Sequence, residues 1–216
     1  MKIILIGPPG SGKGTQSKYL TEKYQIPQIS IGDILRTECY KSTELGIQIK
    51  QKIEQGILIP DNIVIKLLKN RIQKKYCSKG FILDGCPRTV HQAEEMDKKN
   101  IFINYIIEFT STTKVIYERI LGRRIHQASG RTYHVQFNPP KIHNLDDVTQ
   151  ETLTKRKDDN YQTIQNRLIE YNKNKNQILQ FYQSKILNKE IKYCIINSDK
   201  NKKIIYKKIK NFLQQN

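Results

Sequence analysis

The sequence of 216 residues predicts an α/β fold, in which a parallel five-stranded sheet is flanked by helices. Two observations lead to this prediction. Short runs of apolar residues recur along the chain, and stretches with a period near 3.6 residues separate them. Strand, helix and strand in repetition require crossover helices, and these cover both faces of a parallel sheet.

The individual elements follow in order along the chain. The expected strands are 2–6, 28–30, 81–84, 105–109 and 193–196. The expected helices are 13–24, 61–75, 89–99, 112–121, 161–187 and 202–213. Because ligands of such folds bind where the strands end, we expect the functional site at the carboxyl edge of the sheet.

Two stretches interrupt the alternation of strands and helices. Residues 30–59 have a helical pattern without a strand partner, and residues 122–159 are rich in turn formers with short alternating pieces such as 132–137. An ordered irregular insert of this length is usually a functional lid or flap. We therefore expect one core with two insertions. The core would comprise 1–29, 60–121 and 160–216.

The chain is strongly basic, with 38 Lys and Arg against 20 Asp and Glu and a net charge of +18. This charge indicates either nucleic-acid binding or a solvated basic surface. No stacking motif accompanies it, and lysine outnumbers arginine 29 to 9, so we expect no nucleic-acid partner. The basic amphipathic stretch 202–213 could lie on a membrane, but packing on the sheet is the simpler interpretation.

No apolar run reaches the roughly 18 residues of a membrane span, and the first apolar run is too short for a secretory signal. We therefore expect a cytoplasmic protein without a membrane partner. The four cysteines, Cys39, Cys77, Cys86 and Cys194, fit neither a metal-binding spacing nor a disulfide framework. Reduced thiols are their expected state.

The strongest motif is GPPGSGKGT at 7–15, which follows an expected strand and opens an expected helix. That context is typical of a phosphate-binding loop. Glycines allow backbone N–H groups to converge on phosphate oxygens, and Lys13 adds a mobile charge. Gly14 stands where Ser or Thr usually follows the lysine, so a direct hydroxyl ligand for magnesium is less assured.

Asp84 ends the expected strand 81–84 and is followed by GCPRT. A carboxylate at this edge of the sheet can hold Mg²⁺ through water, and a helix-capping role is the alternative. The nine arginines are Arg36, Arg71, Arg88, Arg119, Arg123, Arg124, Arg131, Arg156 and Arg167. In a lysine-rich chain, arginine is expected where a planar fork must grip phosphate, so together with the phosphate loop this set indicates a polyphosphate site.

Five segments together resemble adenylate kinases of the long bacterial form. They are GPPGSGKGT, SIGDILR at 30–36, DGCPRT at 84–89, GRR at 122–124, and TKRKDD at 154–159 with Arg167. The resemblance implies a phosphate-loop kinase core, an AMP-binding insert at 30–59 and a lid at 122–159. It also implies Mg²⁺-dependent, reversible transfer of a phosphoryl group from ATP to AMP, giving two ADP, by a monomer.

The resemblance further implies which residues meet ATP. They are Gly10, Ser11, Gly12, Lys13, Gly14, Thr15, Arg119, Arg123, Thr132, Tyr133 and Lys200. Arg119 would stack on the adenine, and the Lys200 carbonyl would meet the same base. Lys13 would follow the charge as it migrates during transfer.

For AMP, the resemblance implies phosphate, base and pocket contacts. They come from Ile31, Arg36, Ile57, Leu58, Ile59, Gly85, Cys86, Pro87, Arg88, Gln92, Arg156 and Arg167. The catalytic set would be Lys13, Arg88, Arg123, Arg156 and Arg167. Asp33, Asp158 and Asp159 would orient the arginines, and Asp84 would hold magnesium through water.

The chain departs from the family pattern in three ways. Ile31 replaces the usual threonine, so discrimination of the AMP base depends more on Gln92 and the backbone. Cys86 replaces a larger apolar residue and is expected to pack. Many relatives bind zinc through four lid cysteines, whereas this lid has His126, Ser129, Asp146 and Thr149 at those places. Ser and Thr are poor zinc ligands, so we expect a hydrogen-bonded cluster and no zinc.

Two alternatives remain open at this point. One is a kinase for another nucleoside monophosphate, which the loss of the hydroxyl at Ile31 makes conceivable and which Gln92 and the long lid disfavour. The other is a basic nucleic-acid-binding protein that uses its phosphate loop only for regulation. A binding protein of that kind needs no second monophosphate pocket, so the arginine set argues against it.

Overall fold

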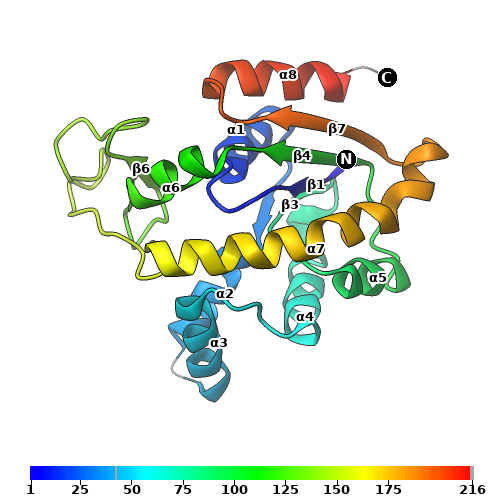
Figure 1. Cartoon of the computed structure of the whole chain (residues 1–216), viewed down its shortest axis with the longest axis horizontal. Helices are drawn as coiled ribbons and strands as arrows, with labels where there is room; N and C mark the ends of the chain where they lie inside the picture. The colour runs from blue at the N-terminus through cyan, green and yellow to red at the C-terminus, as the bar shows by residue number, and fades with distance from the viewer. Residues whose placement is uncertain (42, 215–216) are drawn as a thin grey trace.

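The computed structural model describes residues 1–41 and 43–214, and its core is a parallel sheet with strand order β2-β3-β1-β4-β7 (Figure 1). The strands are β1 Lys2–Ile6, β2 Gln28–Ser30, β3 Phe81–Asp84, β4 Tyr105–Thr110 and β7 Lys192–Asn197. Every pairing in this sheet is parallel. The expected α/β class is therefore confirmed, with β4 and β7 slightly longer than predicted.

Helices connect the strands. They are α1 Lys13–Tyr24, α2 Ile31–Cys39, α3 Glu44–Gln55, α4 Asp61–Ile72, α5 Val90–Lys98, α6 Thr113–Leu121, α7 Tyr161–Leu187 and α8 Lys202–Gln214. The helix predicted over 61–75 ends earlier, at Ile72, and a short 3₁₀ turn, η1 Lys75–Cys77, follows it. Residues 73–75 include no glycine or proline that would mark the end of a helix in the sequence.

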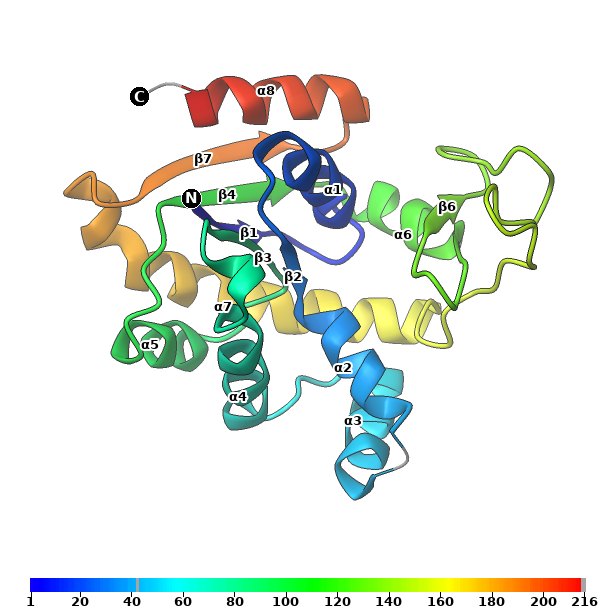
Figure 2. The same ribbon diagram turned by 180° about the vertical axis from the view of Figure 1, so that it is seen from behind.

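Both faces of the sheet are covered, and β1 shows how the sequence produces this. Ile4 and Ile6 point to the face packed with α4, α5 and α7, whereas Ile3 and Leu5 point to the face packed with α1 and α8. Figures 1 and 2 show α7 crossing one side of the sheet and α1 and α8 lying on the other. Side chains alternate along a strand, so a strand covered on both sides must be apolar throughout.

The last helix, α8, packs on the sheet as the simpler interpretation predicted. Ile205, Ile209 and Leu213 are buried in the core, whereas Ile204 is 50% exposed. In the described residues, no helix combines the length and hydropathy needed to cross a bilayer.

The two inserts leave the sheet at its carboxyl edge. One contains α2 and α3. The other contains the antiparallel pair β5 Arg123–Ile125 and β6 Thr132–His134, followed by irregular chain up to α7 (Figure 1). The alternating piece predicted over 132–137 is thus shorter as a strand. The chain turns back after His134, where the His134 N–H donates to the Asn138 carbonyl.

Candidate functional site

The phosphate-binding loop joins β1 to α1 with a backbone that requires glycine. Gly10 and Gly12 have φ angles of 74° and 83°, a region that other residues rarely adopt. A Cβ at Gly7 would lie 2.8 Å from Phe109 Cβ. Gly12 is the N-cap of α1 and offers no side chain to cap its first N–H groups. The start of α1 therefore presents N–H donors and a favourable dipole to an anion.

Lys13 folds back over this loop. Its Nζ donates to the Gly7 and Pro8 carbonyls, both at 2.8 Å, and to Ser11 Oγ at 3.3 Å. Burial lowers the pKa of Lys13 to about 8; Asp84 opposes this shift, and nearby arginines add to it. An ammonium group held only by neutral oxygens in this position is stabilised further by a phosphate oxygen.

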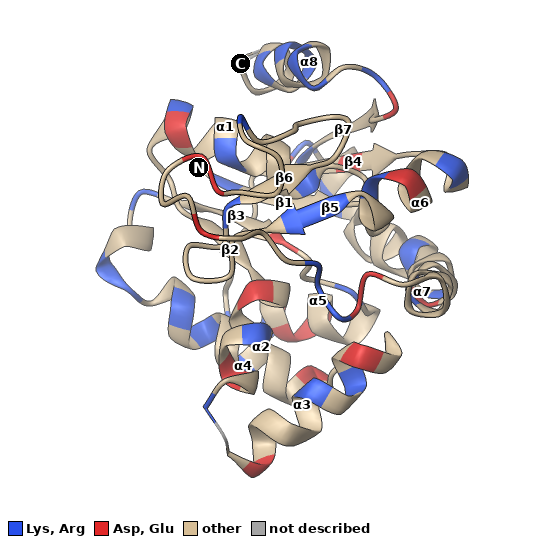
Figure 3. Ribbon diagram, turned by 90° about the vertical axis from the view of Figure 1, so that its left-hand side faces the viewer, with Lys and Arg blue, Asp and Glu red and all other residues tan. Residues whose placement is uncertain are grey.

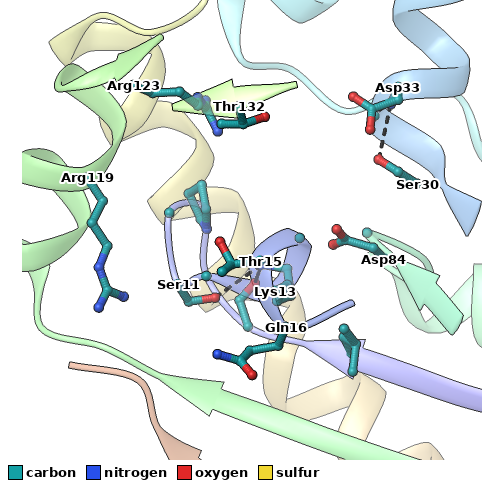
Figure 4. Close-up of a pocket in the computed structure, with 18 of the residues that line it drawn as sticks. Ser11, Lys13, Thr15, Gln16, Ser30, Asp33, Asp84, Arg119, Arg123 and Thr132 are labelled. Atoms are coloured by element: carbon teal, nitrogen blue, oxygen red, sulfur yellow. Dashed lines mark hydrogen bonds between the residues drawn. The ribbon is translucent and has the colours of Figure 1, made fainter. Parts of the chain in front are cut away.

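A cavity of about 1010 Å³ opens at the carboxyl edge of the sheet, beside the phosphate loop and between the inserts. In Figure 4, Arg119, Arg123 and Thr132 lie on one side of Lys13, with Asp33 and Asp84 on the other. Most of the predicted site residues line this cavity. They are Gly10 to Thr15, Ile31, Asp33, Arg36, Ile57, Leu58, Ile59, Asp84, Gly85, Pro87, Arg88, Gln92, Arg119, Arg123, Thr132, Tyr133, Arg156, Arg167 and Lys200.

The remaining predicted residues do not line the cavity. They are Cys86, Asp158 and Asp159, together with His126, Ser129, Asp146 and Thr149 of the insert 122–159, which we call the flap. Cys86 is 1% exposed, and burial raises the pKa of its thiol to about 12. The peptide bond between Cys86 and Pro87 is cis. The Cys86 side chain is therefore a packed neutral thiol.

Aspartates hold several of the cavity arginines in place. Asp159 accepts two hydrogen bonds from Arg123, one of them from Nε at 2.8 Å, and Asp158 accepts from Arg167. Asp33 Oδ1 lies 2.7 Å from Arg36 Nη2 and 3.5 Å from Arg156 Nη2.

These ion pairs also determine the protonation states of the arginines and aspartates that form them. Burial disfavours the charge of Arg123, but the hydrogen bonds and charge of Asp159 outweigh it and raise its pKa. Burial likewise disfavours the Asp33 carboxylate, yet Arg36 keeps the pKa of that carboxyl below its usual range. The pairs therefore keep their charged forms.

The positive charges of two cavity arginines are balanced less completely by nearby carboxylates. Arg156 Nε is buried without a hydrogen-bond partner among the described residues, and burial together with Arg123 and Arg36 lowers its pKa to about 10. Arg88 donates from Nε to the Gly85 carbonyl at 2.9 Å. Desolvation beside the cavity wall, and then the charge of Arg167, lower its pKa. Unbalanced guanidinium groups at the wall of a cavity favour an anion inside it.

One predicted carboxylate has a partner that sequence analysis missed. Asp84 Oδ2 accepts from Gln28 Nε2 over 3.0 Å, while no protein donor in the described residues meets Asp84 Oδ1. Gln28 lies in β2, beside the strand that ends at Asp84. The assignment of neighbouring strands could have suggested this pair.

At the other end of the cavity, residues of the core and the flap meet. Arg119 Nη2 donates to the Ser198 carbonyl at 2.6 Å. Lys202 donates from Nζ to Asn138 Oδ1 in the flap over 2.7 Å. Phe137, which also lines the cavity, stacks on His134 with ring centroids 4.5 Å apart. None of these contacts was predicted, because they join segments that are distant in sequence or irregular.

The flap is held together by a polar cluster around the buried side chains of His126 and Asp146. His126 Nδ1 lies 2.7 Å from Ser129 Oγ, and Thr149 Oγ1 lies 3.2 Å from Asp146 Oδ2 and 3.3 Å from His126 Nε2. The four residues that stand at the places of the zinc-binding cysteines are therefore in contact with one another, as the predicted hydrogen-bonded cluster requires.

Three further residues complete this cluster, a role that the sequence analysis did not assign to them. Glu151 accepts from His126 Nε2, Arg131 bonds both oxygens of Asp146 at 2.8 and 2.7 Å, and the Tyr133 hydroxyl donates to Asp146 at 3.0 Å. The Arg131 hydrogen bonds hold the pKa of Asp146 well below its usual range. No three His, Cys, Asp or Glu side chains in the described part of the chain converge as a metal site.

Comparisons with known proteins agree with this geometry. The sequence profile of a protein family described as "Adenylate kinase" matches residues 5–187. Two curated proteins named "Adenylate kinase", from Buchnera aphidicola subsp. Acyrthosiphon pisum strains Tuc7 and 5A, are each 49% identical over 215 residues. Each alignment covers 100% of this chain and 100% of the relative. The alignments therefore extend over the phosphate loop, both inserts and the segments that line the cavity.

Proposed function

The chain belongs to the adenylate kinase family, and on that premise we propose how its cavity performs the reaction. The enzyme transfers the γ-phosphoryl group of ATP to AMP, reversibly, and gives two ADP. The observation that carries the proposal is one cavity of about 1010 Å³ in which the phosphate loop and the arginines of both inserts share a wall. Two nucleotides with their phosphate groups facing each other suit such a space.

ATP binds at the flap end of the cavity. Its phosphates lie on the N–H groups of Gly10 to Thr15, where Lys13 exchanges loop carbonyls for phosphate oxygens. Arg119, oriented by the Ser198 carbonyl, stacks on the adenine beside the Lys200 carbonyl. Thr132 and Tyr133 approach the nucleotide from the flap.

AMP binds at the end of the cavity that is lined by the insert 30–59. Arg36 and Arg88 grip its phosphate with their planar forks, and Gln92 meets the edge of its base. An apolar pocket surrounds the base, together with Gly85, Pro87 and the backbone of Cys86. The apolar residues of this pocket are Ile31, Ile57, Leu58 and Ile59.

Transfer proceeds by in-line displacement between the two bound nucleotides. Lys13 and Arg88 flank the reacting phosphates, and Arg123, Arg156 and Arg167 neutralise the charge that spreads over the oxygens of the transferred group. Asp33, Asp158 and Asp159 hold these arginines ready, so little reorganisation remains at the moment of transfer. No general base is assigned, because positioning and charge stabilisation suffice for this chemistry.

Mg²⁺ enters as part of the ATP substrate and supplies charge neutralisation between the phosphates. The chemistry of Asp84 suits it, because this carboxylate lines the cavity beside the phosphate loop and leaves Oδ1 without a protein donor in the described residues. Asp84 would hold the ion through water, as Mg²⁺ sheds its water reluctantly.

Both inserts close over the bound pair and exclude water, which would otherwise hydrolyse ATP. The AMP-binding insert spans 30–59, and the flap, which acts as the lid, spans 122–159. The core comprises 1–29, 60–121 and 160–216. In the lid, the polar cluster of His126, Ser129, Asp146 and Thr149 takes the place of zinc. The enzyme acts as a cytoplasmic monomer without nucleic-acid or membrane partners.

A direct assay tests this proposal. Purified protein with ATP, AMP and Mg²⁺ should form ADP, and diadenosine pentaphosphate, which spans both sites, should inhibit in competition with each nucleotide. AMP should exceed UMP, CMP and GMP as acceptor, since those are the substrates of the alternative kinases. Absence of AMP-dependent ADP formation would contradict the proposal.

A further inference from the structure

Asp61 and Gln92 form a hydrogen-bonded pair at the wall of the cavity. Asp61 is the first residue of α4 and Gln92 lies in the first turn of α5, so two helix starts meet here. Gln92 Nε2 donates to Asp61 Oδ1 over 2.7 Å, and Gln92 Oε1 accepts from the Arg88 N–H over 2.8 Å. Gln92 lines the cavity, whereas Asp61 lies behind it.

These two partners determine the orientation of the Gln92 amide. A carboxylate only accepts hydrogen bonds and a backbone N–H only donates. If the amide were rotated by 180°, its oxygen would face the Asp61 carboxylate and its NH₂ would face the Arg88 N–H, and both bonds would be lost. Because Gln92 is only 1% exposed, water cannot readily replace them.

Thr89 holds Asp61 in this arrangement. The Thr89 hydroxyl donates to Asp61 Oδ2 over 2.9 Å and accepts from the Gln92 N–H over 3.1 Å. Asp61 therefore accepts through both oxygens at once, and each donor is fixed at the start of α5. The order of donors and acceptors around Gln92 follows from these contacts alone.

The oriented amide keeps hydrogen-bonding capacity for a base. No second protein acceptor meets Nε2 in the described part of the chain, and besides Arg88 only the Cys86 thiol approaches Oε1, at 3.6 Å. A 6-aminopurine presents a donor at position 6 beside an acceptor at N1, and a 6-oxopurine presents the reverse order. The observed orientation matches the 6-aminopurine, and the rotated one matches the 6-oxopurine.

The rest of the base pocket gives little help with this distinction. Its wall near Gln92 includes Ile31, Ile59 and Val64, whose side chains form no hydrogen bonds. Among the side chains of this wall, selection by the 6-substituent therefore depends on the orientation of the Gln92 amide.

We propose that Asp61 is a positioning residue for base selection, which holds the Gln92 amide so that the acceptor pocket takes 6-aminopurine monophosphates in preference to 6-oxopurine monophosphates. This inference rests on the proposed function, in which Gln92 meets the base of the acceptor. Asp61 acts only through Gln92 and does not touch the substrate.

Asp61→Asn tests the inference, because an amide at this position can donate as well as accept and so no longer excludes the rotated orientation of Gln92. The Arg88 N–H is then the contact that still favours the observed orientation. AMP and inosine monophosphate are the matched acceptors, since they differ only on the edge that Gln92 would meet. The ratio of kcat/KM for AMP to that for inosine monophosphate should fall by roughly tenfold or more. The change should lie in KM for the acceptor, with KM for ATP unaltered. An unchanged ratio would overturn the inference.

A second background separates positioning from a general structural effect. With Gln92→Ala in place, adding Asp61→Asn should leave the ratio within about twofold, because no amide remains to be oriented. An equal fall in both backgrounds would also overturn the inference. Asp97→Asn is the control. Asp97 lies on α5, the helix that contains Gln92, and pairs with Lys185 of α7 without contacting Gln92. If Asp61→Asn folds poorly, Asp61→Ser serves in the same comparison, because its short hydroxyl leaves the amide free to rotate.

The outcomes distinguish this inference from the proposed function. If Gln92→Ala changes neither KM for AMP nor the ratio, then Gln92 does not read the base and the proposed acceptor contact fails. If Gln92→Ala lowers the ratio and Asp61→Asn does not, only the role of Asp61 fails.

Discussion

The cations of the cavity and those of the outer helices differ in the partners that the fold gives them. Six of the nine arginines line the cavity, and Asp33, Asp158 and Asp159 are arranged around four of them. On α8, by contrast, Lys203, Lys207 and Lys208 are exposed to solvent (Figure 3). The net charge of +18 is therefore not a guide to function. What matters is which charges are enclosed and pre-oriented, because only these interact strongly with a ligand.

The largest loss of activity is expected when an arginine of the cavity is replaced by lysine. Arg88→Lys keeps the charge but removes the planar fork, so kcat should fall by roughly 100-fold or more. Steady-state kinetics with AMP check the fall, and thermal unfolding should show an unchanged fold. The matched control is Arg71→Lys, since Arg71 lies outside the cavity over the ring of Tyr76 and its change should leave kcat unaffected.

The next largest effect is expected from the loss of the Lys13 charge at high pH, which should lower kcat/KM for ATP. Because burial lowers its pKa to about 8, the free enzyme loses this charge as the pH rises through that value. We expect kcat/KM for ATP to decline above pH 8, by up to about tenfold per pH unit. Lys13→Arg should abolish the decline at a lower absolute rate, and a decline that persists would assign it to another group.

The same shift has a consequence for stability, with the opposite sign. The unfolded chain binds more protons than the folded one between pH 8 and the ordinary lysine value of 10.5, so this group makes folding more favourable as the pH rises through that window. At pH 7 Lys13→Met should therefore raise Tm, by about 2 °C or more. Differential scanning calorimetry at pH 7 and pH 10 should show the gain shrinking at the higher pH.

A smaller effect is expected from the aspartates that orient the arginines. Asp158 is 4% exposed, bonds Arg167 and lies 3.9 Å from Arg36. Asp158→Asn should raise KM for AMP by about tenfold and lower the free energy of unfolding by roughly 1–3 kcal/mol, because two enclosed guanidinium groups lose compensation. Acceptor titrations and denaturant unfolding measure the two effects. KM for ATP should change less, which separates local disorder from general damage.

The smallest effect should come from the outer lysines. Replacing Lys203, Lys207 and Lys208 together by Gln should change kcat and KM by less than about twofold, since exposed charges are screened and weakly coupled. The assay should be repeated at low ionic strength, where long-range attraction is strongest. A large loss there would show that the outer charges steer nucleotides to the cavity.

Sequence patterns predicted the elements because both faces of the sheet leave a strong apolar signature. The phosphate loop was readable for a related reason, since a glycine backbone, a strand and a helix must coincide in one short segment. The end of α4 was placed wrongly at 75, because residues 73–75 include no glycine or proline that would mark the end of a helix.

Contacts between distant side chains were not readable from the sequence. Asp61 and Gln92 are 31 positions apart on different helices, and Glu151 reaches His126 from an irregular segment. Glu108 sits in an apolar strand run, yet it is paired with Lys175 Nζ at 2.5 Å and accepts from the Tyr193 hydroxyl. Such pairs depend on how elements are placed in space, and spacing along one element carries no information about that.

The stack of Phe137 on His134 has a practical consequence for spectroscopy. The chain contains no tryptophan, so Phe137→Trp would give the protein a single indole, seated on the flap and facing the nucleotide cavity. Excitation at long wavelength would separate its emission from that of the 12 tyrosines, so a stopped-flow experiment without an added dye could test whether nucleotides bind beside the flap.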